Sequence, residues 1–232
     1  MTRYKDFIFI FLIILFHAVG LAGFLSSTYS SLFLRLVPWH LLLMCVLIWI
    51  PTTEKNLWLP GYFVLVYISG FLIEAIGTNT GVIFGVYSYG NVLGIKWLGT
   101  PLLIGINWIL VVFSAGMLVS FLKINGVLPQ ALLAALLVTL LDYVIEPVAI
   151  HFHYWHWQEQ QIPFRNYLAW FAFSSLLLAL FFLLPFKKRS KPAAALFVVQ
   201  LLFFIILNVC FAWGVERAII LFFNFLLSIP LT

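Results

Sequence analysis

Long runs of apolar residues dominate the chain, and short segments that carry most of the charges separate them. An α-helix needs about 20 predominantly apolar residues to cross the hydrocarbon core of a bilayer. The sequence predicts seven such helices, near Phe7–Leu25, Leu36–Ile50, Leu57–Ile76, Leu102–Leu122, Val127–Ile150, Tyr167–Phe186 and Ala193–Trp213. We therefore expect an all-α integral membrane protein, a bundle of about seven transmembrane helices that forms one polytopic domain over residues 1–232.

The two ends of this pattern allow more than one interpretation. The first run follows Arg3 and Lys5 and could be a secretory signal peptide, but six further spans favour a retained anchor. The last apolar stretch, Ala218–Ile229, is too short to cross a bilayer and ends at Pro230. We expect an interfacial or re-entrant segment there, with an eighth helix as the alternative.

The composition agrees with a membrane location and excludes several other classes. The chain of 232 residues is 65% hydrophobic and only 8% charged, too few polar side chains to cover a soluble fold. Most of its basic residues fall on one side of the predicted spans, so the positive-inside rule predicts a cytoplasmic N-terminus. We expect the membrane to be the prokaryotic cytoplasmic (inner) membrane. The net charge of +5 then indicates contact with anionic lipid and not with nucleic acid. Both cysteines lie in apolar runs, which argues against a disulfide framework.

Two of the predicted connections have an unusual composition. The first, Gly77–Thr100, is rich in glycine and aromatic residues, which is typical of irregular backbone packed against protein, such as a re-entrant or interfacial loop. The second, His151–Asn166, clusters histidine with tryptophan. By the count of helices both lie on the same, non-cytoplasmic side, so we expect them to meet above one end of the bundle.

Three of the seven acidic residues, Glu74, Asp142 and Glu146, lie inside apolar runs. A carboxylate at that depth costs about 3 kcal/mol unless it is paired, hydrated or protonated, so such residues usually mark a function. Small residues share the helix face of Glu74, so a neighbouring helix or a flat ligand can approach it. Asp142 and Glu146 are four residues apart and share a face. Because two like charges repel at this distance, we expect at least one acid to keep its proton and to act as a proton donor.

These polar residues also allow other interpretations. The acids could serve only as contacts between helices, paired with Arg165 or Arg217. His151, His153 and His156 resemble the histidine clusters of membrane di-iron enzymes, but the chain has only five histidines, and we expect neither a metal nor another cofactor. A retinal-binding photoreceptor would need a lysine inside a late helix, and a transporter would show an inverted repeat; the sequence shows neither.

Two blocks in the middle of the chain resemble a known family. The first reads EAIGTNTGVIFGVYSYGNVLG and continues through GTPLLIGINW, and the second reads DYVIEPVAIHFHYWHWQEQQIPFRNYLAW. In their pattern of acids, glycines, tyrosines and tryptophans they are similar to the integral-membrane carotenoid biosynthesis proteins, typified by the CruF-type carotenoid hydratases. The helices outside these blocks match that family only in their hydrophobicity.

The resemblance implies a carotenoid 1,2-hydratase, a lyase that adds water to the terminal double bond of a ψ end group, as in lycopene or γ-carotene, to give a tertiary alcohol. One of Glu74, Asp142 or Glu146 would protonate the alkene, and a second acid would take a proton from the water that captures the tertiary carbocation. We favour Asp142 as the donor because it lies deeper in its helix than Glu146. The residues expected to bind substrate, cation or water are Asn79, Tyr87, Tyr89, Trp97, His153, Trp155, Trp157 and Asn166.

Two other functions stay open from the sequence. A carotenoid cyclase would begin with the same protonation, but the chain's own double bond would attack the cation in place of water. A non-enzymatic carotenoid-binding or lipid-binding membrane protein would use the acids only to bridge helices. In each case the expected partners are membrane lipid and a carotenoid, with other carotenoid biosynthesis enzymes as further candidates and no nucleic acid.

Overall fold

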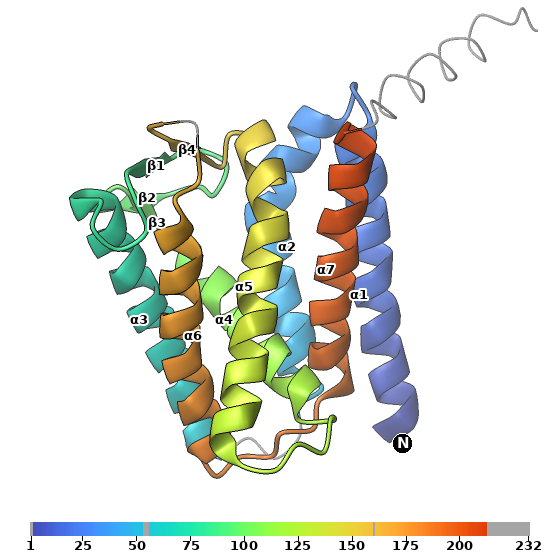
Figure 1. Ribbon diagram of the computed structural model, residues 1–232. Helices are drawn as coiled ribbons and strands as arrows, with labels where there is room; N and C mark the ends of the chain where they lie inside the picture. The colour runs from blue at the N-terminus through green and yellow to red at the C-terminus, as the bar shows by residue number, and fades with distance from the viewer. Residues whose placement is uncertain (1, 53–55, 160, 213–232) are drawn as a thin grey trace, which may run out of the picture.

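The structure is a computed structural model that describes residues 2–52, 56–159 and 161–212. Within these residues it is the all-α bundle that the sequence predicts (Figure 1). Its seven helices are α1 (Thr2–Leu25), α2 (Ser30–Trp49), α3 (Trp58–Thr80), α4 (Ile104–Val119), α5 (Val127–His151), α6 (Phe164–Leu183) and α7 (Lys191–Ala212). The interfacial segment expected at Ala218–Ile229, or the eighth helix that is its alternative, lies outside the described residues.

Six of these helices are long and apolar enough to cross a membrane, and α4 is the exception. The sequence predicts a span over Leu102–Leu122, but α4 has 16 residues, which is about 24 Å of helix against a hydrocarbon core of about 30 Å. Every residue from Trp108 to Met117 is buried, because α4 runs through the middle of the bundle and contacts α3, α5 and α7 (Figure 1). Its apolar character therefore comes from packing against other helices and not from contact with lipid.

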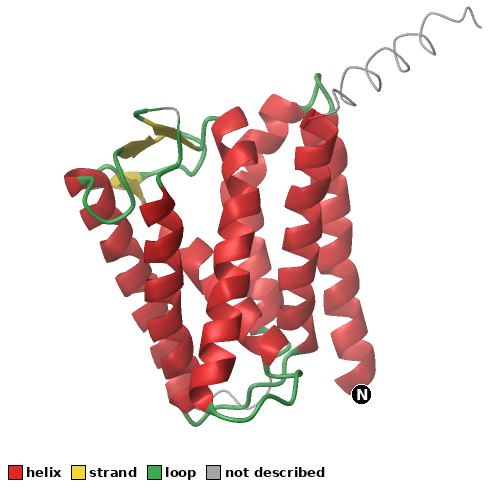
Figure 2. Cartoon of the chain, in the orientation of Figure 1, coloured by secondary structure: helices red, strands yellow, loops and turns green. Residues whose placement is uncertain are grey.

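Four short strands gather at one end of the bundle (Figure 2). They are β1 (Tyr87–Tyr89), β2 (Lys96–Trp97), β3 (Thr100–Pro101) and β4 (Trp155–Trp157). Strands β2 and β3 form an antiparallel pair within the loop after α3. Strand β1 pairs with β4 from the second unusual connection, with Tyr87 opposite Trp157 and Tyr89 opposite Trp155. The expectation that the two connections meet above one end of the bundle is confirmed.

The loop after α3 is held in place by the way that helix ends. Gly81 has a φ of +65°, the left-handed conformation that glycine adopts without strain, and its N–H donates to the carbonyl oxygen of Gly77 at 2.8 Å. The chain then turns back across the end of the bundle and forms β1. Because side chains alternate along a strand, Tyr87 and Tyr89 point to the same side of it.

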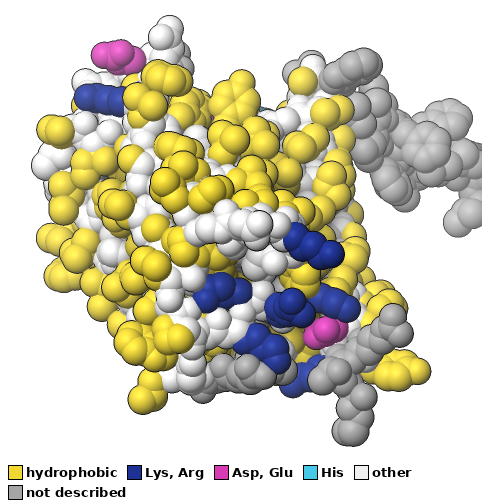
Figure 3. All heavy atoms as spheres, turned by 60° about the horizontal axis from the view of Figure 1, so that its bottom comes forward, with side chains coloured by type: hydrophobic (Ala, Val, Ile, Leu, Met, Phe, Trp, Pro, Cys, Tyr) yellow, Lys and Arg dark blue, Asp and Glu magenta, His cyan; other side chains and the backbone are white. Residues whose placement is uncertain are grey.

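The opposite end of the bundle carries the N-terminus and most of the basic side chains (Figures 1 and 3). The connection between α4 and α5 contains Lys123, and the connection between α6 and α7 contains Lys187, Lys188 and Arg189. The strands and most of the basic residues therefore lie at opposite ends of the helices, and Lys96 of β2 is an exception.

Candidate active site

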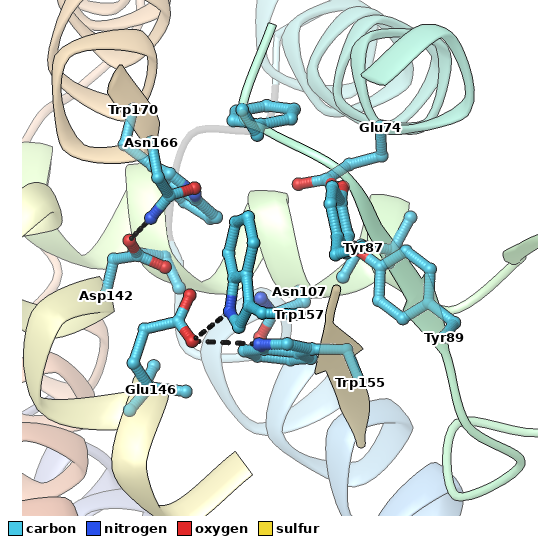
Figure 4. A pocket seen from close by; sticks show the side chains of 14 residues that line it. Glu74, Tyr87, Tyr89, Asn107, Asp142, Glu146, Trp155, Trp157, Asn166 and Trp170 are labelled. Carbon is cyan, nitrogen blue, oxygen red and sulfur yellow. Dashed lines mark hydrogen bonds between the residues drawn. The ribbon is translucent and has the colours of Figure 1, made fainter. Parts of the chain in front are cut away.

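The three acids that the sequence singles out face one small pocket beside β1 and β4 (Figure 4). Glu74 comes from α3, Asp142 and Glu146 come from α5, and the ring of Trp157 lies between the two sides (Figure 4). The side chains of the three acids are only 2–4% exposed. The pocket has a volume of about 30 Å³, which is room for one or two water molecules but not for a large ligand.

Glu74 accepts three hydrogen bonds. The hydroxyl groups of Tyr87 and Tyr89 both donate to Oε2, the latter at 2.8 Å, and the indole Nε1 of Trp108 donates to Oε1 at 3.1 Å. Burial, followed by the charge of Glu74, raises the pKa of both phenols well above its usual range. At neutral pH the two hydroxyl groups therefore remain protonated donors.

A glycine allows Trp108 to reach Glu74. A Cβ atom at Gly70, one turn before Glu74 on α3, would lie only 2.5 Å from Cγ of Trp108. The indole ring also stacks on Trp170 of α6, with ring centroids 4.0 Å apart and an angle of 8° between the planes. The predicted close approach of a neighbouring helix beside Glu74 is thus confirmed, and α4 is that helix.

Asp142 and Glu146 accept fewer hydrogen bonds than Glu74. Oε2 of Glu146 accepts hydrogen bonds from the indole Nε1 atoms of Trp155 and Trp157, at 2.9 and 3.0 Å. The pairing of β4 with β1 holds both tryptophans over the end of α5. Oδ2 of Asp142 accepts from the amide Nδ2 of Asn166 at 2.9 Å. The other oxygen of each acid makes no hydrogen bond to any described residue and can meet a substrate or a water molecule.

All these hydrogen-bond partners are neutral. Within the described residues the three carboxyl groups bond only to tyrosine, tryptophan and asparagine side chains, so pairing with Arg165 does not hold them. Arg217, the other arginine considered, lies outside the described part of the chain. Donors stabilise a carboxylate in its charged form. Glu74, with three donors, is the best stabilised anion, and Asp142, with one donor, is the acid for which the neutral form costs least.

The structure brings five of the eight expected binding residues to the pocket. These are Tyr87, Tyr89, Trp155, Trp157 and Asn166. The other three lie outside it. Asn79 is exposed, and its amide donates to two backbone carbonyl groups. Trp97 is 59% exposed and stacks on Phe71, and His153 is exposed beside the ring of His156.

Asn107 of α4 is a pocket residue that was not expected from the sequence. Its side chain makes no hydrogen bond to the part of the chain that the structure describes and lies at the pocket wall (Figure 4). The signal that could have found it is the same as for the acids, because an amide inside an apolar run also costs free energy unless it meets a partner. Further pocket residues not assigned to binding are Phe84, Ile104, Val111, Ile145 and Trp170.

The arrangement suits acid–base chemistry on an apolar substrate. It combines a well-stabilised carboxylate, two acids with a free oxygen and several aromatic ring faces, which can stabilise a cation. Among the described residues no group of three or more His, Cys, Asp or Glu side chains could hold a metal ion. The three acids thus place both proton donors and negative charge around one small pocket.

Comparison with known proteins assigns the chain to a family. The model of the family described as "Carotenoid biosynthesis protein" matches residues 32–232, which include all three acids and both paired connections. A search of curated proteins finds no match. A search of solved structures finds no match either. Since the family model covers most of its length, this chain belongs to the carotenoid biosynthesis protein family and has a role in carotenoid biosynthesis.

Proposed function

We propose that this protein is a carotenoid hydratase, which adds water to the terminal C1=C2 double bond of a ψ end group and forms a tertiary alcohol. The observation that carries the proposal is the pocket with three buried acids, two of which keep one oxygen without a hydrogen bond to any described residue. An unactivated alkene does not react with neutral water, so the reaction needs a proton donor and a site that stabilises a carbocation. The pocket provides groups suited to both.

The first step is protonation of the alkene by Asp142. Its neutral carboxyl group gives a proton to C2, the electrons of the double bond form the new C–H bond, and C1 becomes a tertiary carbocation. The ring faces of Tyr87, Trp155 and Trp157, which line the pocket, stabilise the cation. The negative charge of Glu74 on the opposite wall acts in the same direction.

The second step is capture of the cation by water. The amide of Asn107, which makes no hydrogen bond to a described residue, holds the water molecule in the pocket, and the water oxygen forms a bond to C1. Glu146 takes the proton that this water releases through its free oxygen. The proton then returns to Asp142, one helical turn away on α5, and the site is ready for another cycle. One alkene and one water give one alcohol, so no electrons enter or leave.

The membrane setting fits this reaction. The six long apolar helices and the family role are consistent with contact with lipid and a carotenoid. We place the protein in a prokaryotic inner membrane. The basic end and the N-terminus then face the cytoplasm, because the positive-inside rule favours this orientation. In this arrangement one polytopic domain takes its substrate from the bilayer, and other enzymes of carotenoid biosynthesis can act on the same pool.

Expression in bacteria that accumulate lycopene tests the proposal. We expect a new pigment that elutes earlier on reversed-phase chromatography and has the mass of lycopene plus one water. A new pigment with unchanged mass would support cyclisation, and unchanged lycopene bound to the protein would support a binding function. Either of these two results would overturn the hydratase proposal. The Asp142→Asn variant, expressed at the same level, is the matched control.

A further inference from the structure

A second and much larger cavity lies between α1, α2, α5 and α7. Its volume is about 370 Å³, in the range of roughly 300–1,000 Å³ typical of sites for small ligands. Its lining is mainly apolar and includes Phe24, Phe33, Phe203 and Phe204. We call this cavity the chamber. A cavity of this size with such a lining favours a ligand that is held by burial of apolar surface.

The chamber and the acid pocket share one wall. Four residues line both cavities: Ile104, Asn107, Ile145 and Trp155. The pocket alone has only about 30 Å³, so an end group that reaches the acids has to continue into a neighbouring space. The chamber is the space that adjoins it.

The chamber also reaches the lipid-facing surface. Three residues of its lining, Val19 of α1 and Leu36 and Trp39 of α2, are 47%, 44% and 69% exposed in the described structure. All three lie on helices long and apolar enough to cross a membrane. A hydrophobic chain dissolved in the bilayer can therefore reach the chamber between α1 and α2 without passing through water.

We propose that the chamber binds the polyene chain of the carotenoid whose end group reaches the acid pocket, and that the chain enters from the bilayer between α1 and α2. The identity of this ligand rests on the function proposed above. The chamber is too small for a whole carotenoid, so the rest of the chain extends through the opening into lipid. Substrate binding and proton transfer then belong to two adjoining cavities formed by different helices.

Gly20 of α1 offers a way to fill the chamber. It lines the chamber, and a Cβ atom there would lie 3.7 Å from the ring of Phe203, which is ordinary contact. The Gly20→Leu variant therefore adds a side chain without an overlap at Cβ and occupies ligand space. The matched control is Gly61→Leu on α3, because Gly61 is exposed, has nothing within 4 Å of a Cβ atom and lines neither cavity.

Pigment binding tests the proposal directly. Both variants are made in the Asp142→Asn background, so that lycopene is bound but not consumed, and the pigment that co-purifies with the full chain is measured. We expect Gly20→Leu to lower bound lycopene by about tenfold, because the chain loses apolar burial in the chamber, and Gly61→Leu to leave it unchanged. Equal pigment in the two variants would overturn the proposal.

A second pair of variants covers the case in which Gly20→Leu does not fold. Leu36→Trp adds bulk at the opening of the chamber, and Leu65→Trp adds the same bulk on α3, where Leu65 is 41% exposed against 44% for Leu36. Only the first is expected to slow lycopene uptake from vesicles. Absence of hydrated product from the wild type would overturn the hydratase function. Slower lycopene uptake in Leu36→Trp but not in Leu65→Trp would still support the proposal that the chamber binds the polyene chain.

The chamber also contains an amide whose oxygen has no hydrogen-bond partner among the described residues. Gln200 of α7 is 7% exposed, and its Oε1 atom has no hydrogen-bond partner among the described residues. His17 lies in the same lining, and its Nδ1 donates to the carbonyl oxygen of Ile13 at 2.8 Å, so in the neutral ring its Nε2 is an acceptor. His40 packs its ring against that of His17, with centroids 4.8 Å apart. Gln200 and His17 can therefore form hydrogen bonds with a hydroxyl group in the chamber.

We infer that Gln200 and His17 bind the hydroxyl group of a carotenoid alcohol as it leaves through the chamber. The Gln200→Leu variant keeps a similar side-chain volume but removes the amide. We expect it to weaken binding of monohydroxylated lycopene relative to lycopene by about fivefold, the worth of one hydrogen bond. The control is Gln130→Leu on α5, outside both cavities. An unchanged ratio of the two affinities would overturn this inference.

Discussion

The acid pocket and the chamber adjoin each other but are built in different ways. In the pocket, tyrosine, tryptophan and asparagine donors from two strands, α4 and α6 hold each of the three carboxyl groups. The chamber is more than ten times larger, mainly apolar, and contains an amide without a partner in the described residues. Fixed polar groups suit the making of bonds, and a roomy apolar space suits the binding of a chain. Changes in the pocket should therefore lower turnover, whereas changes in the chamber should lower binding.

The largest expected effect is that of Asp142→Asn. The amide keeps the size of the carboxyl group but has no acidic proton, so hydration should fall by at least about 100-fold, the usual contribution of a general acid. Pigment binding should stay near that of the wild type, because Asp142 does not line the chamber. Product and bound pigment from the same cells measure both quantities. A normal rate of hydration would show that Asp142 is not the proton donor.

Glu74→Gln should have the second largest effect. An amide oxygen cannot replace both carboxylate oxygens, so one of the donors Tyr87, Tyr89 and Trp108 loses its partner. An unsatisfied buried group costs about 2 kcal/mol, which predicts a Tm several degrees lower. Turnover should also fall, because the anion beside the cation is lost. Thermal unfolding in detergent is the measurement, with Glu159→Gln, an exposed acid, as control. Equal Tm values would show that these bonds do not hold the loop to α3.

Asn107→Leu probes the wall that the two cavities share. If its amide holds the water, hydration should drop by about tenfold, the worth of a hydrogen bond to a developing charge. Lycopene binding should change little, because a leucine of similar size preserves the apolar wall. Rates of product formation and pigment content decide between the two effects. A loss of binding with unchanged turnover would assign Asn107 to the chamber and not to the pocket.

The smallest effect is expected for Trp97→Phe. Trp97 was expected from the sequence to bind substrate, but its ring lies outside the pocket and stacks on Phe71 at the surface. The rate of hydration should stay within about twofold of the wild type, as is usual for surface changes.

In contrast, Trp155→Phe removes one of the two hydrogen-bond donors to Glu146 and should lower the rate of hydration by about fivefold. Equal losses for both variants would contradict the assignment of these two residues.

Much of the fold could be predicted because hydrophobic length alone determines it. Seven apolar runs gave seven helices, and helix counting placed the two unusual connections at the same end. The length of α4 could not be predicted, because a helix buried among helices is as apolar as one in lipid. The pairing of β1 with β4 was equally hidden, since strands of three residues are too short to show an alternating pattern.

The candidate site was predictable where the free-energy cost of a buried charge is high. Glu74, Asp142 and Glu146 stood out as acids in apolar runs, and the structure gathers them in one pocket. Asn79 was misplaced because it follows Glu74 by five residues, which turns it about 140° around the helix. The residues of the chamber come from separate helices, and no local pattern connects His17 with Gln200. Such sites become visible only when the helices are packed.

In the proposed reaction a carboxylic acid protonates an alkene, and water captures the resulting cation. Isotopic labelling tests it most directly, with purified protein, lycopene and a mixture of D₂O and H₂¹⁸O. We expect the tertiary alcohol to carry ¹⁸O on C1 and one deuterium on C2. An alcohol without ¹⁸O from the solvent, or without deuterium at C2, would show that the protein does not hydrate the alkene by protonation and water capture.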